Sequence, residues 1–257
     1  MKKNKLAKAI APLLLSVSIS ASSADIQNQS GATGNSNFIP LGGGSVLWDQ
    51  TANASGNGAP DQDFEAAFDV YDSWGADDFV VNSFGWSISR VNTVGTQSLG
   101  GSAVSVDVEF LSDAGGSPGA VMCSYAGVVP TSQVDGSFQI DLPGSCDLTP
   151  GTYWLAIQTN QDFGGGNGQH FWSNATVQTG NPGHWVNPGD GFGSGCTTWT
   201  PQTTCGVGGG VNPDFLFQIE GSILPPPVVP SLNWLGLALM FFTLGFVGHK
   251  FIRKQDA

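Results

Sequence analysis

The chain has 257 residues, of which 20 are acidic and 8 are basic, giving a formal net charge of −12 at pH 7. Between residues 9 and 249 the only basic residue is Arg90. This central part therefore lacks the Lys and Arg that bind phosphate backbones and anionic lipid surfaces, which excludes nucleic acid as a partner.

Four lysines begin the chain, and residues 9–19 after them are apolar. Ser22, Ser23 and Ala24 then give a small-residue cleavage site, the usual order of a secretory signal peptide. About 11 apolar residues cannot cross a ~30 Å hydrocarbon core as a helix. We therefore predict a signal peptide at residues 1–24 and a flexible segment at 25–44; cleavage after Ala21 and a retained anchor are the alternatives.

Residues 45–221 are predicted to form one all-β domain. Short runs rich in β-branched and aromatic residues recur between Gly, Pro, Asn, Asp and Ser, with no sustained helical period. The predicted strands are 46–48, 64–71, 76–81, 86–94, 103–111, 120–129, 138–142, 153–159, 170–173 and 215–219. This number of short strands favours a jelly-roll-like β-sandwich, with an open barrel as the alternative.

Alternation is clearest in residues 103–111. Val104, Val106, Val108 and Phe110 are expected on one face of a half-buried strand, and the residues between them on the other. Residues 112–119 then predict a hairpin loop, in which Asp113 accepts hydrogen bonds from nearby backbone and glycines take positive φ.

All four cysteines lie in the part predicted to be exported: Cys123, Cys146, Cys196 and Cys205. An oxidising compartment then makes two disulfides the expected state. Three pairings can be drawn, and we favour Cys123 with Cys146 and Cys196 with Cys205, because the second pair closes a short Gly/Thr/Pro loop. The cysteine spacings match neither a zinc site nor a CxxC redox motif.

Motifs of known catalytic sites are missing. The exported part holds only His170 and His184, without HExxH or GxSxG, and its Gly-rich stretches precede no predicted helix. We therefore expect no enzymatic activity and no cofactor. A glycoside hydrolase using two clustered carboxylates is kept as a further alternative, because it needs only two acids flanking a cleft.

Seven acids fall within residues 61–78: Asp61, Asp63, Glu65, Asp69, Asp72, Asp77 and Asp78. Carboxylate oxygens at this density could hold Ca²⁺, with Asp77 and Asp78 as the expected ligands. Solvated carboxylates explain the same residues without a metal.

Tryptophans supply the second binding hypothesis. Trp172, Trp185 and Trp199 lie in or beside the Gly/Asn-rich stretch 160–212, where exposed indoles could stack on sugar rings. Burial in the core of a sandwich is the alternative, because Trp is usually well buried. A carbohydrate-binding module, with or without Ca²⁺, is therefore the alternative function.

The C-terminal end carries a second membrane signal. Residues 222–231 form a Pro-rich linker that no helix can enter, and residues 232–248 are uncharged and reach ~25 Å as a helix. This is the lower limit for one transmembrane helix. Residues 249–257 form a basic tail whose Lys250, Arg253 and Lys254 predict that this end stays in the cytoplasm, with the body outside the inner membrane.

This tail resembles the C-terminal sorting signals of Gram-negative bacteria, most closely the IPTL-CTERM type and more distantly the PEP-CTERM type. The residues that carry the resemblance are Val229, Pro230, Ser231, Leu232 and Trp234, then the apolar run and the basic stop. The resemblance implies cleavage near the proline motif by an exosortase-like transpeptidase and transfer to the surface or the extracellular matrix. This chain has Val-Pro-Ser-Leu where the family has Ile-Pro-Thr-Leu. A plain single-pass anchor is the alternative.

The body is similar to a recurrent β-sandwich module of secreted bacterial proteins with sorting tails. Segments 76–81, 110–119, 151–155 and 213–217 carry this similarity, which implies fold and location rather than chemistry. The sequence as a whole predicts an exported, surface-sorted or secreted β-sandwich without catalytic activity, an envelope or matrix component.

Overall fold

The computed structural model describes residues 26–29, 44–82, 84–226 and 239–244. The chain divides into two compact units, Met1–Leu224 and Pro225–Ala257. The predicted signal peptide, the sorting motif from Val229 to Trp234 and the basic stop of Lys250, Arg253 and Lys254 lie outside the described residues. Of the predicted transmembrane helix only residues 239–244 are described, and they are helical. Within the described ranges, no helix has the length and apolarity to cross a bilayer.

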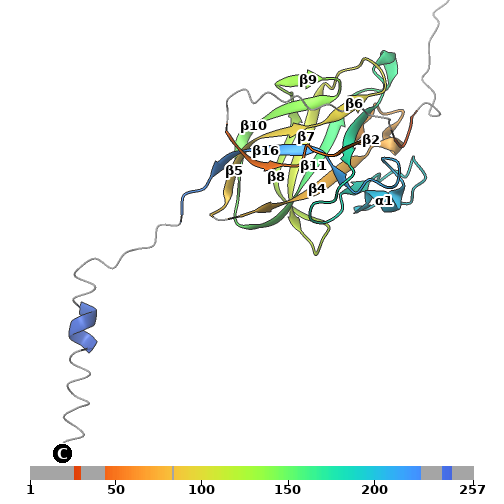
Figure 1. Cartoon of the computed structure of the whole chain (residues 1–257). Coiled ribbons are helices and arrows are strands. Elements are labelled where there is room, and N and C mark those ends of the chain that lie inside the picture. Colours follow the sequence, from red (N-terminus) through yellow and green to blue (C-terminus); the bar gives the residue numbers. More distant parts are fainter. Residues whose placement is uncertain (1–25, 30–43, 83, 227–238, 245–257) are drawn as a thin grey trace, which may run out of the picture. The chain divides into compact units, whose positions relative to one another are not determined.

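The first unit is an all-β body built mainly from two sheets (Figure 1). The five-stranded sheet has the order β1 (Ser45–Asp49), β16 (Phe217–Ile223), β5 (Trp86–Thr93), β10 (Ser137–Leu148) and β9 (Ser132–Val134), all antiparallel. The seven-stranded sheet has the order β14 (Thr200–Pro201), β13 (His184–Val186), β4 (Trp74–Val81), β11 (Gly151–Asn160), β7 (Ser105–Asp113) and β8 (Pro118–Val128), with β3 (Gln62–Asp63) parallel to β11.

A smaller sheet continues the body at one end. It has the order β15 (Asp214–Phe215), β12 (His170–Ala175) and β2 (Ala54–Pro60), with β6 (Gly95–Gln97) also paired to β12. Among the described residues of this unit, helical structure is limited to single turns: α1 (Gln202–Cys205), η2 (Asp69–Tyr71) and η3 (Gly164–Gly166). These turns lie in the connections that carry the loops described below.

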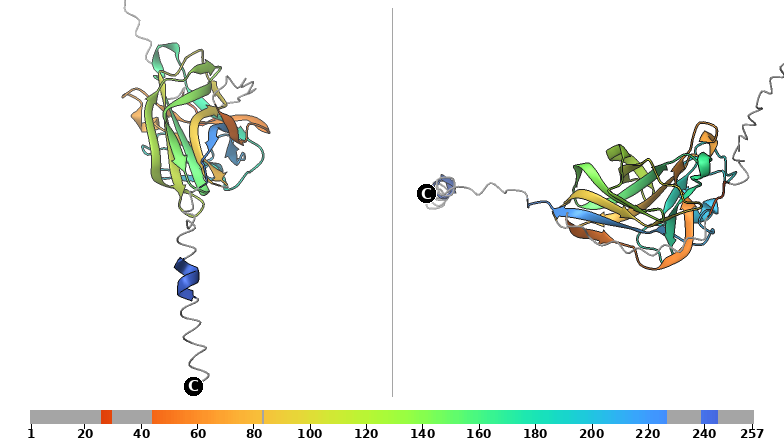
Figure 2. Two further views of the ribbon diagram at one scale, coloured as in Figure 1. Left: turned by 90° about the vertical axis from the view of Figure 1, so that its left-hand side faces the viewer. Right: turned by 90° about the horizontal axis from the view of Figure 1, so that it is seen from above.

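The two large sheets pack face to face around one apolar core, so the body is a two-layer sandwich (Figure 2). Strands β5, β10 and β16 contribute Trp86, Ile88, Phe138, Ile140, Leu148, Phe217 and Ile219, and strands β4, β7 and β11 contribute Phe79, Val81, Val106, Val108, Phe110, Leu155 and Ile157. This core confirms the prediction of an all-β fold with period-2 strands.

Strand β7 follows the predicted alternation except at its start. Val106, Val108 and Phe110 are fully buried, but Val104 is 73% exposed because the strand begins one residue later. The hairpin loop after it confirms its prediction: Asp113 accepts hydrogen bonds from Gly115 N and Gly116 N, both 3.0 Å. Both glycines have positive φ, which a side chain would strain.

The expectation of a strand at residues 64–71 is wrong. A loop and the single turn η2 replace it, with Phe64 buried against Phe163. Residues 26–29, from the segment predicted to be flexible, contact the body through Ile26 and Gln27. In both places aromatic side chains from distant loops pack together.

Both favoured disulfide pairings are confirmed. Cys123 of β8 is bonded to Cys146 of β10, with 6.0 Å between the Cα atoms, so this disulfide joins one large sheet to the other. Cys196 is bonded to Cys205 of α1, with 5.9 Å between the Cα atoms. Disulfides persist in oxidising compartments, so this body belongs in an oxidising, extracytoplasmic environment.

Candidate functional site

The outer face of the seven-stranded sheet carries a second apolar cluster, separate from the core. Its buried members are Ala76 of β4, Leu111 of β7, and Trp154 and Ala156 of β11. Two half-buried indoles, Trp74 and Trp199, pack against them. We call these six residues the outer cluster.

Strand register explains the composition of the outer cluster. Ala76 pairs with Ala156 on one side and with His184 of β13 on the other. The two alanines are the smallest side chains at the centre of this face, so neighbouring indoles can lie over them. His184 meets Trp154 edge to face, with 4.8 Å between the ring centroids. Side chains two residues apart share a face, which places Trp74 with Ala76.

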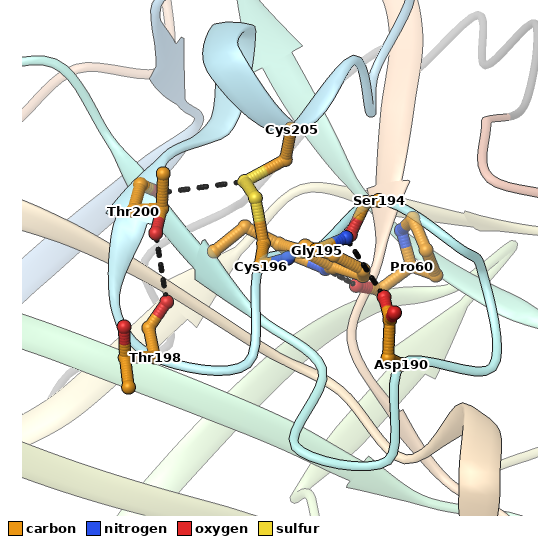
Figure 3. Close-up of a disulfide and its surroundings, with 9 residues drawn as sticks. Pro60, Asp190, Ser194, Gly195, Cys196, Thr198, Thr200 and Cys205 are labelled. Carbon is orange, nitrogen blue, oxygen red and sulfur yellow. Dashed lines mark hydrogen bonds between the residues drawn. A yellow bond between two sulfur atoms is a disulfide. The ribbon is translucent and has the colours of Figure 1, made fainter.

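Trp199 is held by the second disulfide, although it lies in an irregular loop. The Cys196–Cys205 bond closes the loop that contains it, and Thr200 pairs with Trp185 in the β13–β14 ladder. Figure 3 shows this loop, in which Thr200 Oγ1 donates to Thr198 O at 2.9 Å. The disulfide on one side of Trp199 and strand β14 on the other therefore fix its position in the loop.

Polar groups occur on the same sheet face. Trp154 is fully buried, and its Nε1 donates to Asp113 Oδ1 at 3.0 Å. Glu109 pairs with Ala156 and is half-buried, with Ser124 Oγ donating to its Oε1 at 3.1 Å. The face therefore carries two half-buried indoles, Trp74 and Trp199, and a half-buried carboxylate, groups that can stack on a sugar ring and accept its hydroxyls.

Two of the three predicted sugar-stacking tryptophans are core residues, so these two predictions are wrong. Trp172 is fully buried, stacks on Phe215 at 4.4 Å and donates to Leu216 O at 2.9 Å. Trp185 is fully buried and donates to Pro60 O at 2.6 Å. Both indole faces and both N–H groups are thus used inside the protein, and only Trp199 of the three reaches the surface.

Sequence reasoning missed Trp74. The signal that could have found it is the period of β4: counting back from Asp78 through Ala76 by steps of two places Trp74 on the outer face. Because Trp74 lies just before the predicted strand 76–81, it was not counted among the residues of that strand.

Asp77, one of the two predicted calcium ligands, is completely buried and accepts three N–H groups. Gln50 Nε2 and Phe215 N donate to its Oδ2 at 2.8 and 2.7 Å, and Asp78 N donates to its Oδ1 at 2.8 Å. Burial, the carboxylate of Asp214 and that of Asp78 raise the pKa of Asp77. A carboxylate used in this way is part of the interior and not an open ligand.

Asp78 points to the other face of β4 and holds the loop that follows β12. Asn181 N and Nδ2 donate to it at 3.1 and 2.8 Å. The two predicted ligands are therefore not brought together. In the described part of the chain, no group of three or more His, Cys, Asp or Glu side chains is arranged to hold a metal ion.

The other acids of segment 61–78 are also dispersed. Asp61 is buried against His170, with 2.5 Å between Oδ1 and Nδ1. The carboxylate of Glu65 accepts Phe163 N and Gly164 N at 2.6 and 3.0 Å. Asp63 and Asp72 are hydrogen-bonded to each other through their side chains.

The Asp63–Asp72 pair gives a pH prediction. Burial, together with the charges of Asp63 and Asp69, raises the pKa of Asp72 to about 6. An unfolded Asp titrates near 3.9, so between about pH 4 and pH 6 the folded state binds the extra proton and loses stability as pH rises. Asp72→Asn keeps the acceptor for Phe64 N and removes the charge. We expect about 1 kcal/mol of added stability at pH 8, since solvent screens this half-exposed group.

Thermal unfolding between pH 4 and pH 8 checks this expectation. The Asp72→Asn variant should melt about 2–4 °C higher than wild type at pH 8 and show a flatter profile. Asp135→Asn, in an exposed turn, is the matched control and should follow wild type. Parallel curves for wild type and Asp72→Asn would contradict the assignment.

Comparison with known proteins gave no match: no family model, no curated protein and no solved structure is similar to this chain.

Proposed function

We propose that this protein is an exported, jelly-roll-like β-sandwich without catalytic activity, a component of the cell envelope or of the extracellular matrix. The observation that carries the proposal is the pair of disulfides in an acidic body whose described residues include one basic side chain, Arg90. Such a body suits an oxidising compartment and repels both nucleic acid and anionic lipid.

In this proposal, the two ends of the chain direct its export and sorting. A leader at residues 1–24 would start export, and the tail from Val229 onward would be read by an exosortase-like transpeptidase in the inner membrane. The proposal includes a stage at which residues 232–248 anchor the protein with its body outside the cytoplasm. Cleavage near Pro230 would then release it to the surface or the medium.

Mass spectrometry of the protein recovered from its own cells tests this proposal. We expect an N-terminus at Asp25, a C-terminus near the Val229–Leu232 motif, and four cysteines that resist alkylation without reductant. Recovery of the chain from the cytosol with both ends intact and free thiols would overturn it.

A second function, carbohydrate binding, is favoured by the outer cluster. Trp74 and Trp199 are half-buried on the sheet face that also carries Glu109, and a sugar could stack on the indoles and donate hydroxyls to a carboxylate of this face. We propose that this face, rather than the Trp172 and Trp185 positions, is the glycan site. The proposal needs no calcium, because the polar partner is already a side chain of the face.

The Asp63–Asp72 pair does not suit glycoside hydrolysis, because the two side chains are in direct hydrogen-bond contact. Hydrolysis requires carboxyl groups about 5 Å or more apart on either side of the scissile bond.

A further inference from the structure

The segment just after the predicted cleavage site is bound to the body like a separate peptide. We call residues 26–29 the arm. Ile26 is 8% exposed and lies in an aromatic pocket that we call the seat. The seat is formed by Phe64, Phe68, Tyr71, Phe163 and Phe192. These five rings come from three loops, so the pocket exists only in the folded body.

Backbone groups of the arm are bound as well. Gln27 N donates to Gln169 Oε1 at 2.8 Å, and Gln169 Nε2 donates back to Gln27 O at 2.7 Å. Gly208 N donates to Asn28 O at 3.4 Å. The buried side-chain amide of Gln169 thus satisfies both backbone polar groups of Gln27.

The seat is braced by contacts that do not involve the arm. Glu65 accepts both Phe163 N and Gly164 N, which fixes one ring of the pocket. Tyr71 meets Phe192 edge to face at 5.2 Å. Gln169 N donates to Ser98 Oγ at 2.8 Å, which positions the Gln169 side-chain amide that binds the arm. The seat can therefore persist when the arm leaves it.

An open pocket of about 370 Å³ adjoins the seated arm. It is lined by residues 26–29 together with Tyr71, Gly191 and Phe192. The space beside Ile26 therefore remains accessible from solvent, and an incoming peptide can approach the seat there.

We propose that the seat also accepts the arm of a second copy of this chain, so that exchange of arms joins copies to one another. The arm is attached to β1 through residues 30–43, which can extend over roughly 45 Å at ~3.3–3.6 Å per residue. A domain of this size has a radius of gyration near 16 Å. The connection is long enough for the arm to reach a neighbouring body.

The protein concentration determines whether an arm occupies the seat of its own chain or that of a second copy. The contacts are the same whether the arm comes from the same chain or from a neighbour, so the difference is the effective concentration of the arm, in the millimolar range for a short tether. One apolar side chain and three hydrogen bonds hold the arm, and it can leave without unfolding the sandwich. Arm exchange in the cell rests on the proposed function, because a surface layer or matrix provides such crowding; binding at the seat does not.

The first experiment measures the seat alone. In the full chain carrying Ile26→Asp, whose own arm cannot enter the pocket, a fluorescent peptide of residues 25–30 should bind saturably. The same peptide with Asp in place of Ile should not bind. Adding Gln169→Ala to the protein should weaken binding at least tenfold. If Ile26→Asp unfolds the protein, Ile26→Ala replaces it. No saturable binding to a variant with the circular dichroism of wild type would overturn the proposal.

The second experiment measures exchange. The sedimentation of wild type should show dimers that grow with concentration toward the millimolar range, and Ile26→Asp should remain monomeric. A mixture of Ile26→Asp, with an intact seat, and Gln169→Ala, with an intact arm, should form mixed dimers more readily than either variant alone. Peptide binding without dimers at any concentration would restrict the seat to its own arm and would overturn arm exchange while leaving the proposed export function untouched.

Discussion

Asp61→Asn is expected to lower the free energy of unfolding by about 2–3 kcal/mol, because it replaces the carboxylate of a fully buried, hydrogen-bonded contact with His170. Asp61 and His170 are 0% and 1% exposed. His170 Nδ1 lies 2.5 Å from the Asp61 carboxylate and Nε2 lies 2.8 Å from Gly136 O. Nε2 donates to the Gly136 carbonyl, and an amide in place of the carboxylate would change the buried contact at Nδ1.

Urea unfolding at pH 7 measures this effect. Asp190→Asn is the matched control, since that exposed carboxylate accepts one backbone N–H, from Gly195, and should change stability by less than about 1 kcal/mol. The double variant Asp61→Asn with His170→Gln should lose less than the sum of the single losses, because the two residues form one unit. A loss below about 1 kcal/mol for Asp61→Asn would contradict the expected contribution of the carboxylate.

Trp199→Ala should weaken polysaccharide binding by about 2 kcal/mol, roughly 30-fold, if the outer cluster is the glycan site. Trp74→Ala should act in the same direction. Each removes an indole that is half-buried against Ala76 and Ala156, so the sandwich core is not touched. Depletion binding to cellulose, chitin and xylan, followed by calorimetry with oligosaccharides of the polymer retained, gives the affinities.

Two controls separate binding from folding. Trp48→Ala removes another half-buried indole, on β1 of the opposite sheet, and should leave binding unchanged. Replacing Cys196 and Cys205 by Ser should weaken binding, because the disulfide holds the loop of Trp199. If wild type bound none of the polymers, or if Trp48→Ala were as damaging as Trp199→Ala, the glycan assignment would fail.

The strands of the fold could be predicted where one face of a strand is buried and the other exposed. Strand β7 alternates, and the hairpin after it contains the Asp and Gly residues that its turn requires. Strand β2 (Ala54–Pro60) could not be predicted, because Gly56, Gly58 and Asn57 give it no apolar period. Its place depends on β12, whose Phe171 and Trp172 pair with Pro60 and Ala59.

The candidate site was predictable only in part. The Gly/Asn-rich stretch 160–212 predicted Trp199, but no local pattern distinguishes it from Trp172 and Trp185, whose burial is decided by the packing of β12 and β13. Closeness in sequence also led to the wrong interpretation of the acidic segment 61–78 as a group of calcium ligands. Adjacent residues such as Asp77 and Asp78 point to opposite faces of a strand, so a dense run of acids is divided among different partners.

The place of β16 determines how the sandwich responds to mechanical force. Strand β16 lies between β1 and β5, and Gly221 pairs with both Ser45 and Ile88. A pull on the chain beyond Leu224 would reach the body at this strand, which is hydrogen-bonded to two neighbours rather than one. A body tethered by its C-terminal end would therefore have its tether attached to an inner strand of the sheet and not to an edge strand.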